Sequence, residues 1–325
     1  SSYLAQDTLL AGLSYAGPII MKIIGHRGGS YSAPENTGAA FRWAFDGARA
    51  DVVDGCECDV QFTRDNVIVV LHDSTLWRTA QKEPPPTWQG SIEEYTVLLR
   101  THINQLNYAQ VKDIDIGSWK GPEFATERLI TLEEAVGVVP NGKTLLVEIK
   151  GGDNAIVPLL VNLATTCGRI DPGTVKWIGF DKELMSDMKR QLPSFQVYLL
   201  GQFFMMTPCL AFTDSAVVRW TREALDAGLD GIDLPASTWQ LTHGVVETVR
   251  CQEAAQAGGD ATKKKKLTVG AWCYVPHLNS SDTELAWERM RDRGADFFTS
   301  DLPPEIFSWA RSARERAARG HGPAP

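Results

Sequence analysis

The sequence of 325 residues lacks several features that mark specialised proteins. No apolar run reaches the roughly 20 residues of a membrane-spanning helix, so we expect no transmembrane segment. The formal net charge of −8 provides no basic face, which argues against a nucleic-acid partner but not against a small anionic ligand. The six cysteines are scattered without a CxxC pair, which argues against a zinc site.

The placement of the cysteines also bears on the cellular compartment. Cys56 and Cys58 lie two apart on an expected strand, so they point the same way and are poorly placed to bridge each other. This pattern favours a reducing environment, and we expect a cytoplasmic protein. A signal peptide removed before Ser1 is the alternative left open. The sequence gives no prediction of oligomeric state.

Alternation of short apolar strands with amphipathic helical stretches is the main pattern of the chain. Eight strand-then-helix units favour a (β/α)8 TIM barrel. A doubly wound sheet is the alternative, but Gly28 and Gly29 do not form the Gly-rich phosphate loop that it would need. The expected strands are 22–26, 55–59, 144–149, 175–180, 196–200, 230–234, 267–272 and 296–300. The expected helices include 37–48, 131–138, 155–167, 182–191, 221–228, 244–257, 282–293 and 304–318.

These elements divide the chain into three parts. We expect an N-terminal extension over residues 1–20, a single barrel domain over 21–318 and a tail over 319–325. The irregular segment at about 74–130, which contains PPP at 84–86, reads as an insertion on top of the barrel. Active sites of such barrels lie at the C-terminal ends of the strands, so this insertion is placed to shape a substrate pocket.

A hairpin is expected between the second strand and the insertion. The runs DVQFT and VIVVLHD are separated by only two or three residues, too few for a parallel crossover. If the turn centres on Arg64 and Asp65, His72 returns to lie roughly opposite Glu57. A histidine 15 positions along the chain would then stand beside the carboxylates of the second strand.

Acidic residues at two strand ends predict a metal site. Glu57 and Asp59 leave the same face of a strand, and two like charges so close need a cation or a shared proton. Glu148 ends the strand TLLVEIK, with Lys150 two residues later on the same face. Three carboxylates suit one Mg²⁺ or Ca²⁺ ion. A solvated acidic pair and a structural Glu148–Lys150 ion pair are the alternatives.

Two histidines and an arginine accompany these acids. His26 closes the first strand next to Arg27, and the hairpin brings His72 back toward the same end of the barrel. Near neutral pH, one imidazole can take a proton while a protonated one gives a proton. Packing of His26 alone is the competing interpretation.

The motifs HRG (26–28), PENT (34–37), ECD (57–59), HD (72–73), VEIK (147–150) and TSDLP (299–303) occur in this order. Together they resemble the glycerophosphodiester phosphodiesterase family, and the resemblance runs from residue 21 to about 307. It implies a barrel with a small insertion after HD, and hydrolysis of glycerophosphodiesters to an alcohol and glycerol 3-phosphate with a divalent cation.

Carried over by motif, the resemblance also implies roles for single residues. It makes His26 and His72 the general acid and base. It implies phosphate binding by Arg27 and Lys150, and places Trp272 near a glycerol pocket. The metal site implied consists of Glu57, Asp59 and Glu148, with Glu35 as a further ligand or an orienting acceptor.

The chain departs from the family pattern where the alcohol group would be recognised. Cys273 and Val275 stand where the family usually has threonine and asparagine, WIGFD (177–181) replaces a serine-rich strand end, and FFMM occupies 203–206. We therefore expect a small-molecule phosphodiester or a lysophospholipid as substrate. Lysophospholipase D or sphingomyelinase D-like activity, giving a cyclic or linear phosphate, and a non-catalytic binding protein are the rival interpretations.

Overall fold

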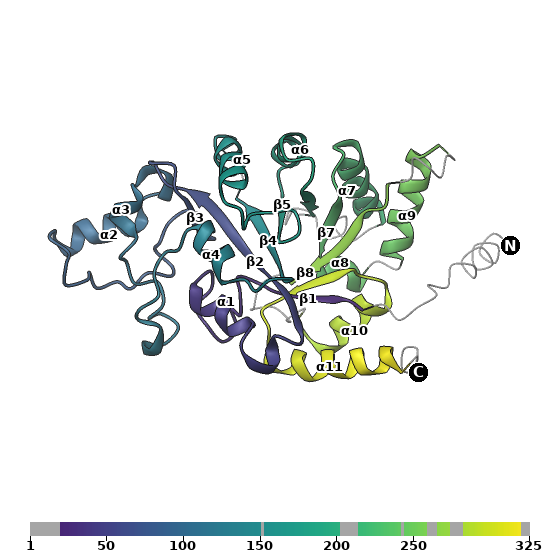
Figure 1. The fold of residues 1–325 in the computed structure, drawn as a ribbon, viewed down its shortest axis with the longest axis horizontal. Coiled ribbons are helices and arrows are strands. Elements are labelled where there is room, and N and C mark those ends of the chain that lie inside the picture. Colours follow the sequence, from purple (N-terminus) through teal and green to yellow (C-terminus); the bar gives the residue numbers. More distant parts are fainter. Residues whose placement is uncertain are drawn as a thin grey trace.

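Eight parallel strands form a closed barrel in this computed structural model, which describes residues 20–150, 153–201, 214–241, 244–258, 265–273 and 282–319. The barrel closes because β1 pairs with β2 on one side and with β9 on the other. The predicted (β/α)8 TIM barrel is thereby confirmed (Figure 1). Its strands are β1 (Lys22–Gly25), β2 (Val53–Phe62), β4 (Thr144–Ile149), β5 (Val175–Gly179), β6 (Gln196–Leu200), β7 (Gly231–Pro235), β8 (Thr268–Trp272) and β9 (Phe297–Ser300).

Helices surround these strands on the outside (Figure 1). They are α1 (Gly38–Ala44), α4 (Leu132–Val138), α5 (Ile156–Thr166), α6 (Lys182–Gln191), α7 (Asp214–Asp226), α8 (Ala236–Leu241), α9 (Val245–Gln256), α10 (Glu284–Asp292) and α11 (Pro304–Ala318). Most bounds agree with the sequence patterns within one or two residues. However, α1 ends at Ala44 rather than at residue 48, β2 continues to Phe62, and α7 begins at Asp214 rather than at residue 221. Residues 1–19, the FFMM segment at 203–206, Val275 and residues 320–325 lie outside the described residues.

The two faces of β2 divide its side chains between two environments. Cys56 and Cys58 are fully buried in the apolar layer between the barrel and its helices. The cysteines of the described residues are free thiols. The inner face of the barrel holds a smaller apolar cluster that includes Ile24, Leu146 and Tyr198. Glu57 and Asp59 alternate with these cysteines along β2 and face the other way, so the acids of this strand lie inside the barrel.

The predicted hairpin joins β2 to β3 (Ile68–Val70), and the two strands are antiparallel. Its turn centres on Arg64 and Asp65, because the Asn66 N–H donates to the carbonyl of Thr63 over 2.9 Å. Asn66 then takes a left-handed conformation with φ of 66°, which asparagine tolerates well. The Leu71 N–H donates to the Asp59 carbonyl over 2.9 Å, so the next residue, His72, stands at the level of the acids.

The segment after the HD motif forms the insertion that the sequence predicted. It extends away from the barrel beyond β3 and carries α2 (Ile92–Arg100) and α3 (Tyr108–Val111), at the left of Figure 1. The short 3₁₀ turns η3 (Ile103–Gln105) and η4 (Pro122–Phe124) belong to it, whereas η2 (Gly47–Arg49) precedes β2. A separate apolar cluster, which includes Leu76, Tyr95 and Leu129, holds the insertion together.

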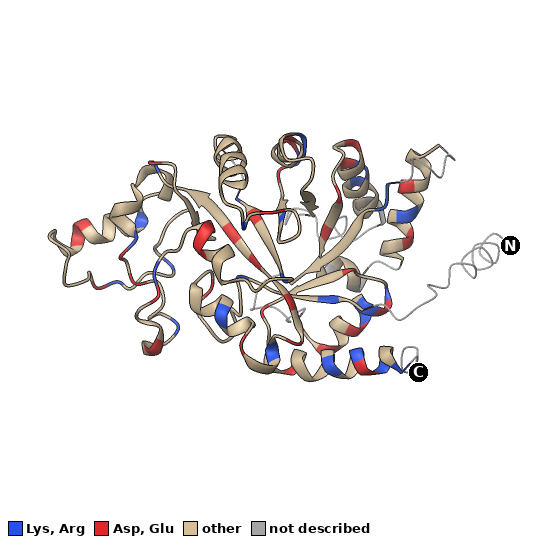
Figure 2. Ribbon diagram, in the orientation of Figure 1, with Lys and Arg blue, Asp and Glu red and all other residues tan. Residues whose placement is uncertain are grey.

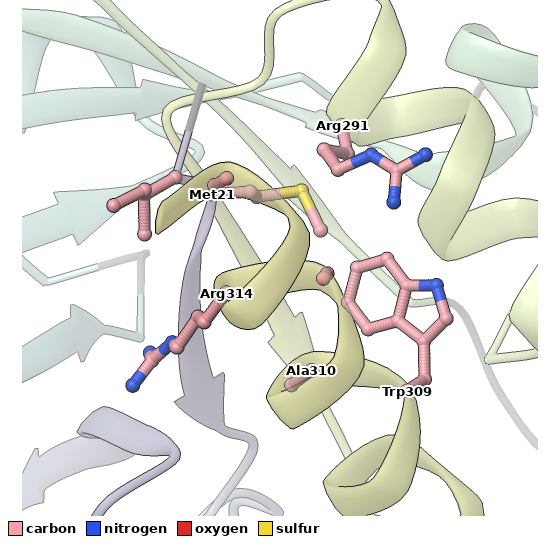
Figure 3. A pocket seen from close by; sticks show the side chains of 8 residues that line it. Met21, Arg291, Trp309, Ala310 and Arg314 are labelled. Atoms are coloured by element: carbon pink, nitrogen blue, oxygen red, sulfur yellow. The ribbon is translucent and has the colours of Figure 1, made fainter. Parts of the chain in front are cut away.

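Away from the C-terminal end of the barrel, the described surface is of mixed charge. Lysines and arginines are mixed with acids along helices such as α9 and α11 (Figure 2). A hollow between the start of β1 and α11 is lined by Met21 and Trp309, which point toward one another, and by Arg291 (Figure 3). It lies at the N-terminal end of the barrel strands, where contacts generally serve stability. Among the described residues, no helix is long and apolar enough to cross a membrane.

Candidate active site

The turn after β1 shapes one side of the site. Arg27 has a φ of 50° and Gly28 a φ of 83°, so the chain reverses within two residues. A Cβ on Gly28 would lie 2.7 Å from the Cβ of Ala40, which explains the glycine in the HRG motif. The strained Arg27 is held because its N–H donates to Glu57 Oε2 over 2.9 Å. The turn therefore fixes Arg27 directly on an acid of β2.

Three carboxylates converge at the C-terminal end of the barrel. Asp59 pairs in register with Glu148, and the oxygens of Glu57, Asp59 and Glu148 all lie within 4.8 Å of one another. Glu57 and Asp59 are only 3% and 1% exposed. Burial, and then the charge of Asp59, raises the pKa of Glu57. Since like charges repel strongly in such a place, this group of acids needs a cation or a proton.

Cations of the chain already neutralise part of this group. Lys150 Nζ lies 2.7 Å from Asp59 Oδ1 and 2.5 Å from Glu148 Oε1, so the Glu148–Lys150 pair is part of a three-residue bridge. Arg27 Nε lies 3.3 Å from Asp59 Oδ2. Burial acts to raise the pKa of Asp59, but the charges of Lys150 and Arg27 outweigh burial and hold this pKa well below its usual range. Burial raises the pKa of Glu148 against the opposing charge of Lys150.

The PENT motif supports the acids from the other side. Asn36, buried and with a φ of 58°, donates from Nδ2 to Asp59 Oδ2 over 2.8 Å. Its neighbour Thr37 caps α1 by accepting the Ala40 N–H, as expected for this residue type. Asn36 thus orients one of the three carboxylates.

His26 is paired with an aspartate from the far end of the chain. Its Nδ1 lies 2.6 Å from Asp301 Oδ1, and the hydroxyl of Ser30 donates to the same oxygen over 3.0 Å. Burial and Arg27 act to lower the pKa of His26, but the hydrogen bond and charge of Asp301 outweigh them, and the pKa is raised. With Nδ1 engaged, Nε2 is the nitrogen left to meet a ligand.

His72 has a partner of the same kind. Its Nδ1 lies 2.7 Å from Asp73 Oδ1, and Arg78 in the insertion donates from Nε to Asp73 Oδ2 over 2.8 Å. The same guanidinium binds both oxygens of Glu35, at 2.6 and 2.8 Å. Glu35 also accepts from Arg27 over 2.8 Å. These contacts form a chain of alternating charges from the insertion to the turn after β1.

This chain of charges bears on the role of Glu35. Both of its oxygens are bound by guanidinium groups, and Glu35 is not one of the three acids that share the metal-sized space. Of the two roles that the resemblance implies, the arrangement favours the orienting acceptor. The sequence could not separate the roles, because Arg78 had not been identified as its partner.

Aromatic side chains line another part of the barrel mouth. Trp272, at the end of β8, meets Phe180, just after β5, with ring centroids 5.9 Å apart and planes at 83°. Since β6 and β7 lie between these strands in the sheet, the pair reaches across this side of the mouth. The polar side chains gather on the other side, around β9, β1, β2 and β4. The site therefore has one ionic wall and one aromatic wall.

Three acids of the site carried no role in the sequence analysis. Asp73 and Asp301 were present in the HD and TSDLP motifs, so the motif letters could have suggested them. Asp233 lies in the middle of β7 and is 1% exposed, and neither carboxyl oxygen has a hydrogen-bond partner among the described residues. Burial, followed by the charges of Glu57 and Glu148, raises its pKa well above the usual range. Asp233 therefore lies within electrostatic reach of the group of three, where burial and like charge favour its protonated form.

Comparison with known proteins gives relatives for part of the chain. A glycerophosphodiester phosphodiesterase of Caldanaerobacter subterraneus is 37% identical over 132 residues, which are 40% of this chain and 45% of that protein. Glycerophosphodiester phosphodiesterase 1 of Mus musculus is 32% identical over 143 residues, which are 44% of this chain and 38% of that protein. The matched stretch thus spans less than half the length of these curated relatives.

Solved structures share the fold over nearly the whole chain. A phosphodiesterase of Oleispira antarctica in complex with sn-glycerol-3-phosphate has a TM-score of 0.63 at 21% identity, covering 91% of this chain and 97% of that one. A glycerophosphodiester phosphodiesterase of Parabacteroides distasonis has a TM-score of 0.61 at 22% identity, covering 93% and 100%. At these identities the likeness establishes the barrel fold.

The model of the glycerophosphoryl diester phosphodiesterase family matches residues 26–203, which is more than half of the chain. The match begins at His26 and includes the motifs that carry the three carboxylates and His72. The resemblance stated from the motifs is thus confirmed, and this chain belongs to the glycerophosphoryl diester phosphodiesterase family.

Proposed function

We propose that this protein is a metal-dependent phosphodiesterase that hydrolyses glycerophosphodiesters to an alcohol and glycerol 3-phosphate. The observation that carries the proposal is the group of Glu57, Asp59 and Glu148, whose oxygens lie within 4.8 Å of one another at the barrel mouth. Two histidines lie within electrostatic reach of this group, which supports the proposal. The charge of His26 acts on the pKa of Glu57, whereas that of His72 acts on Asp59 and Glu148.

The three carboxylates fit one divalent cation, Mg²⁺ or Ca²⁺. All the donors are oxygen atoms, which these ions prefer. Glu57 Oε1 is buried and has no hydrogen-bond partner among the described residues, a costly state for an ionised carboxylate unless a cation reaches it. A cation held there would supply positive charge to a phosphoryl oxygen of the substrate.

Arg27 and Lys150 are the cations of the chain that would bind the phosphate. Both are already oriented by carboxylates, since Arg27 is held by Glu35 and Asp59, and Lys150 by Asp59 and Glu148. Such fixed charges stabilise developing negative charge without having to reorganise during the reaction. The acids therefore serve both to bind metal and to hold two basic side chains in place.

The two histidines would move the protons of the reaction. One imidazole takes a proton from the nucleophile, which is water or a neighbouring hydroxyl of the substrate. The other imidazole gives a proton to the departing alkoxide. Asp301 and Asp73 each accept a hydrogen bond from Nδ1 of their histidine, which leaves Nε2 for the proton transfer. A water nucleophile gives glycerol 3-phosphate directly, whereas a substrate hydroxyl gives a cyclic phosphate first.

The aromatic wall bears on the alcohol group of the substrate. Phe180 and Trp272 present aromatic ring faces and edges at this side of the mouth, and Phe180 is partly exposed. Such a surface suits an apolar chain or a quaternary ammonium group, as in choline. Glycerophosphocholine is the substrate that we favour, and a lysophospholipid is the second candidate.

A panel of phosphodiesters tests the proposal. Glycerophosphocholine, glycerophosphoethanolamine and lysophosphatidylcholine are incubated with Mg²⁺, with Ca²⁺ and with EDTA, and ³¹P NMR distinguishes linear from cyclic phosphate. We expect turnover that EDTA abolishes. Glu57→Ala and His72→Ala should each lower turnover by about 100-fold or more while circular dichroism remains unchanged. His102→Ala, which removes an exposed histidine of the insertion, is the matched control.

Three outcomes would contradict the proposal or change its reaction class. Near-normal turnover of either Glu57→Ala or His72→Ala would refute the assigned site. Absence of turnover on every substrate and metal would favour a non-catalytic binding protein. A cyclic phosphate that accumulates without later hydrolysis would favour the sphingomyelinase D-like lyase.

A further inference from the structure

Three side chains of different chemistry converge at the ends of β8, β9 and β1. Cys273 follows β8, and its N–H donates to the Thr299 carbonyl of β9 over 3.1 Å. Asp301 follows β9, and His26 follows β1, the next strand of the barrel. The Cys273 sulfur, a ring nitrogen of His26 and a carboxylate oxygen of Asp301 all lie within 4.8 Å of one another.

The donor set of this group differs from that of the three carboxylates. Thiolate sulfur and imidazole nitrogen favour Zn²⁺ and related thiophilic ions, whereas Mg²⁺ and Ca²⁺ take oxygen ligands. Three protein ligands with a fourth position left to water is a common arrangement for zinc. Two neighbouring groups at one barrel mouth thus select for different classes of ion.

The pair of His26 and Asp301 needs only a small opening to admit an ion. His26 Nδ1 and Asp301 Oδ1 are 2.6 Å apart, whereas ligands of tetrahedral zinc with bonds of about 2.0–2.2 Å lie roughly 3.3 Å apart. The pair must therefore open by less than about 1 Å. The side chains of His26 and Asp301 are 23% and 33% exposed, so an ion can reach them from solvent. Cys273, 6% exposed, forms the floor.

The thiol must lose its proton to bind a metal. Burial, and then the charges of Asp301 and Asp282, raises the pKa of Cys273, while a hydrogen bond from the Asp301 backbone opposes the rise. The thiol is therefore neutral at neutral pH, and an incoming ion must displace its proton into solvent. Only ions that bind thiolate strongly meet this cost, which adds to the discrimination against Mg²⁺ and Ca²⁺.

We infer that Cys273, His26 and Asp301 form an inhibitory site for thiophilic divalent ions such as Zn²⁺ and Cd²⁺. An ion bound to His26 Nδ1 replaces the hydrogen bond to Asp301. His26 then loses the partner that orients its ring and raises its pKa, and proton transfer by His26 stops. The binding part of this inference stands alone, and the inhibition rests on the proposed role of His26 in the reaction.

Binding and inhibition are tested separately in the full chain. Excess Mg²⁺ is present throughout to occupy the carboxylates, and Cd²⁺ is added while the thiolate-to-metal charge-transfer absorption is followed in the ultraviolet. We expect one equivalent of thiolate-bound Cd²⁺ in the unmodified protein and none in Cys273→Ser. Zn²⁺ should inhibit turnover of the unmodified protein, and Cys273→Ser should need about tenfold more Zn²⁺ or higher, relative to its own uninhibited rate.

Further variants keep the test decisive if serine disturbs the buried position. Cys273→Ala places no unpaired hydroxyl there. It should also lose the Cd²⁺ charge-transfer absorption and need more Zn²⁺ for inhibition. Cys251→Ser, which removes an exposed thiol on α9, should change neither measurement. Equal Cd²⁺ absorption or equal Zn²⁺ inhibition in both Cys273 variants would overturn the inference. A charge-transfer band that depends on Cys273 in a protein without turnover would instead contradict the proposed function alone.

Discussion

The contact between His26 and Asp301 gives the sharpest prediction about catalysis. In Asp301→Asn, the side chain keeps its size and an acceptor oxygen but loses its charge. A hydrogen bond to a charged partner contributes about 1.5–3 kcal/mol, and each 1.4 kcal/mol corresponds to a factor of ten. Because both side chains are partly exposed, we expect the lower part of this range, a fall in kcat of about 10- to 30-fold.

The pH dependence of this variant carries more information than its rate. Asp301 raises the pKa of His26 against burial and Arg27, so removal of its charge lowers that pKa. If His26 is the general acid, the alkaline limb of the pH–rate profile moves to lower pH. If His26 is the general base, the acidic limb moves to lower pH instead. The limb that moves therefore identifies the role of His26, which neither motif nor distance decides.

A matched control separates charge from local packing. Ser30→Ala removes the second hydrogen bond to Asp301 but leaves the carboxylate in place, so both limbs should stay where they are. The assay is kcat against pH with glycerophosphocholine and saturating metal. If Asp301→Asn lowers kcat but leaves both limbs of the pH–rate profile unmoved, the idea that Asp301 sets the pKa of His26 for proton transfer is refuted.

Three further predictions concern metal, burial and the insertion. Glu57→Gln should raise the unfolding temperature of the metal-free protein in calorimetry and abolish its stabilisation by Mg²⁺ or Ca²⁺. The pKa of Glu57 is raised by burial, so between its ordinary and its raised pKa this acid lowers the free energy of unfolding by about 1.4 kcal/mol per pH unit, and glutamine removes that cost. Asp233→Asn should likewise raise the unfolding temperature of the metal-free protein, but the stabilisation by Mg²⁺ or Ca²⁺ should remain. Arg78→Met breaks partly exposed pairs with Glu35 and Asp73, so kcat should fall by no more than about fivefold, and a larger loss would indicate substrate contact.

The hairpin shows what sequence can predict about this site. The distance between Asp59 and His72 along the chain, and the short link at Arg64 and Asp65, allowed only one local geometry. The turn and the level of His72 followed from that constraint and are confirmed. The barrel itself followed from the same kind of local pattern, repeated eight times.

The pairing of His26 with Asp301 is a contact that could not be predicted from the sequence. The two residues are 275 positions apart, and they meet only because β9 closes the barrel against β1. Spacing along the chain contains no information on such a contact. The same limit applies to Cys273, whose spacing argued against zinc while the fold sets it beside a histidine and an aspartate. Arg78 was missed because the insertion has no periodic pattern from which to orient a side chain.

The balance of charge at the barrel mouth bears on the order of binding. The described residues of the site include six acids other than Asp233 (Glu35, Glu57, Asp59, Asp73, Glu148 and Asp301) and three permanent cations (Arg27, Arg78 and Lys150). A phosphodiester anion would enter an excess of negative charge even with one histidine protonated. A divalent cation removes that excess, so metal and substrate should each increase the affinity for the other by the same factor. The raised pKa of Glu57 expresses the same imbalance in the protein alone, since without a cation the site reduces its charge by keeping a proton.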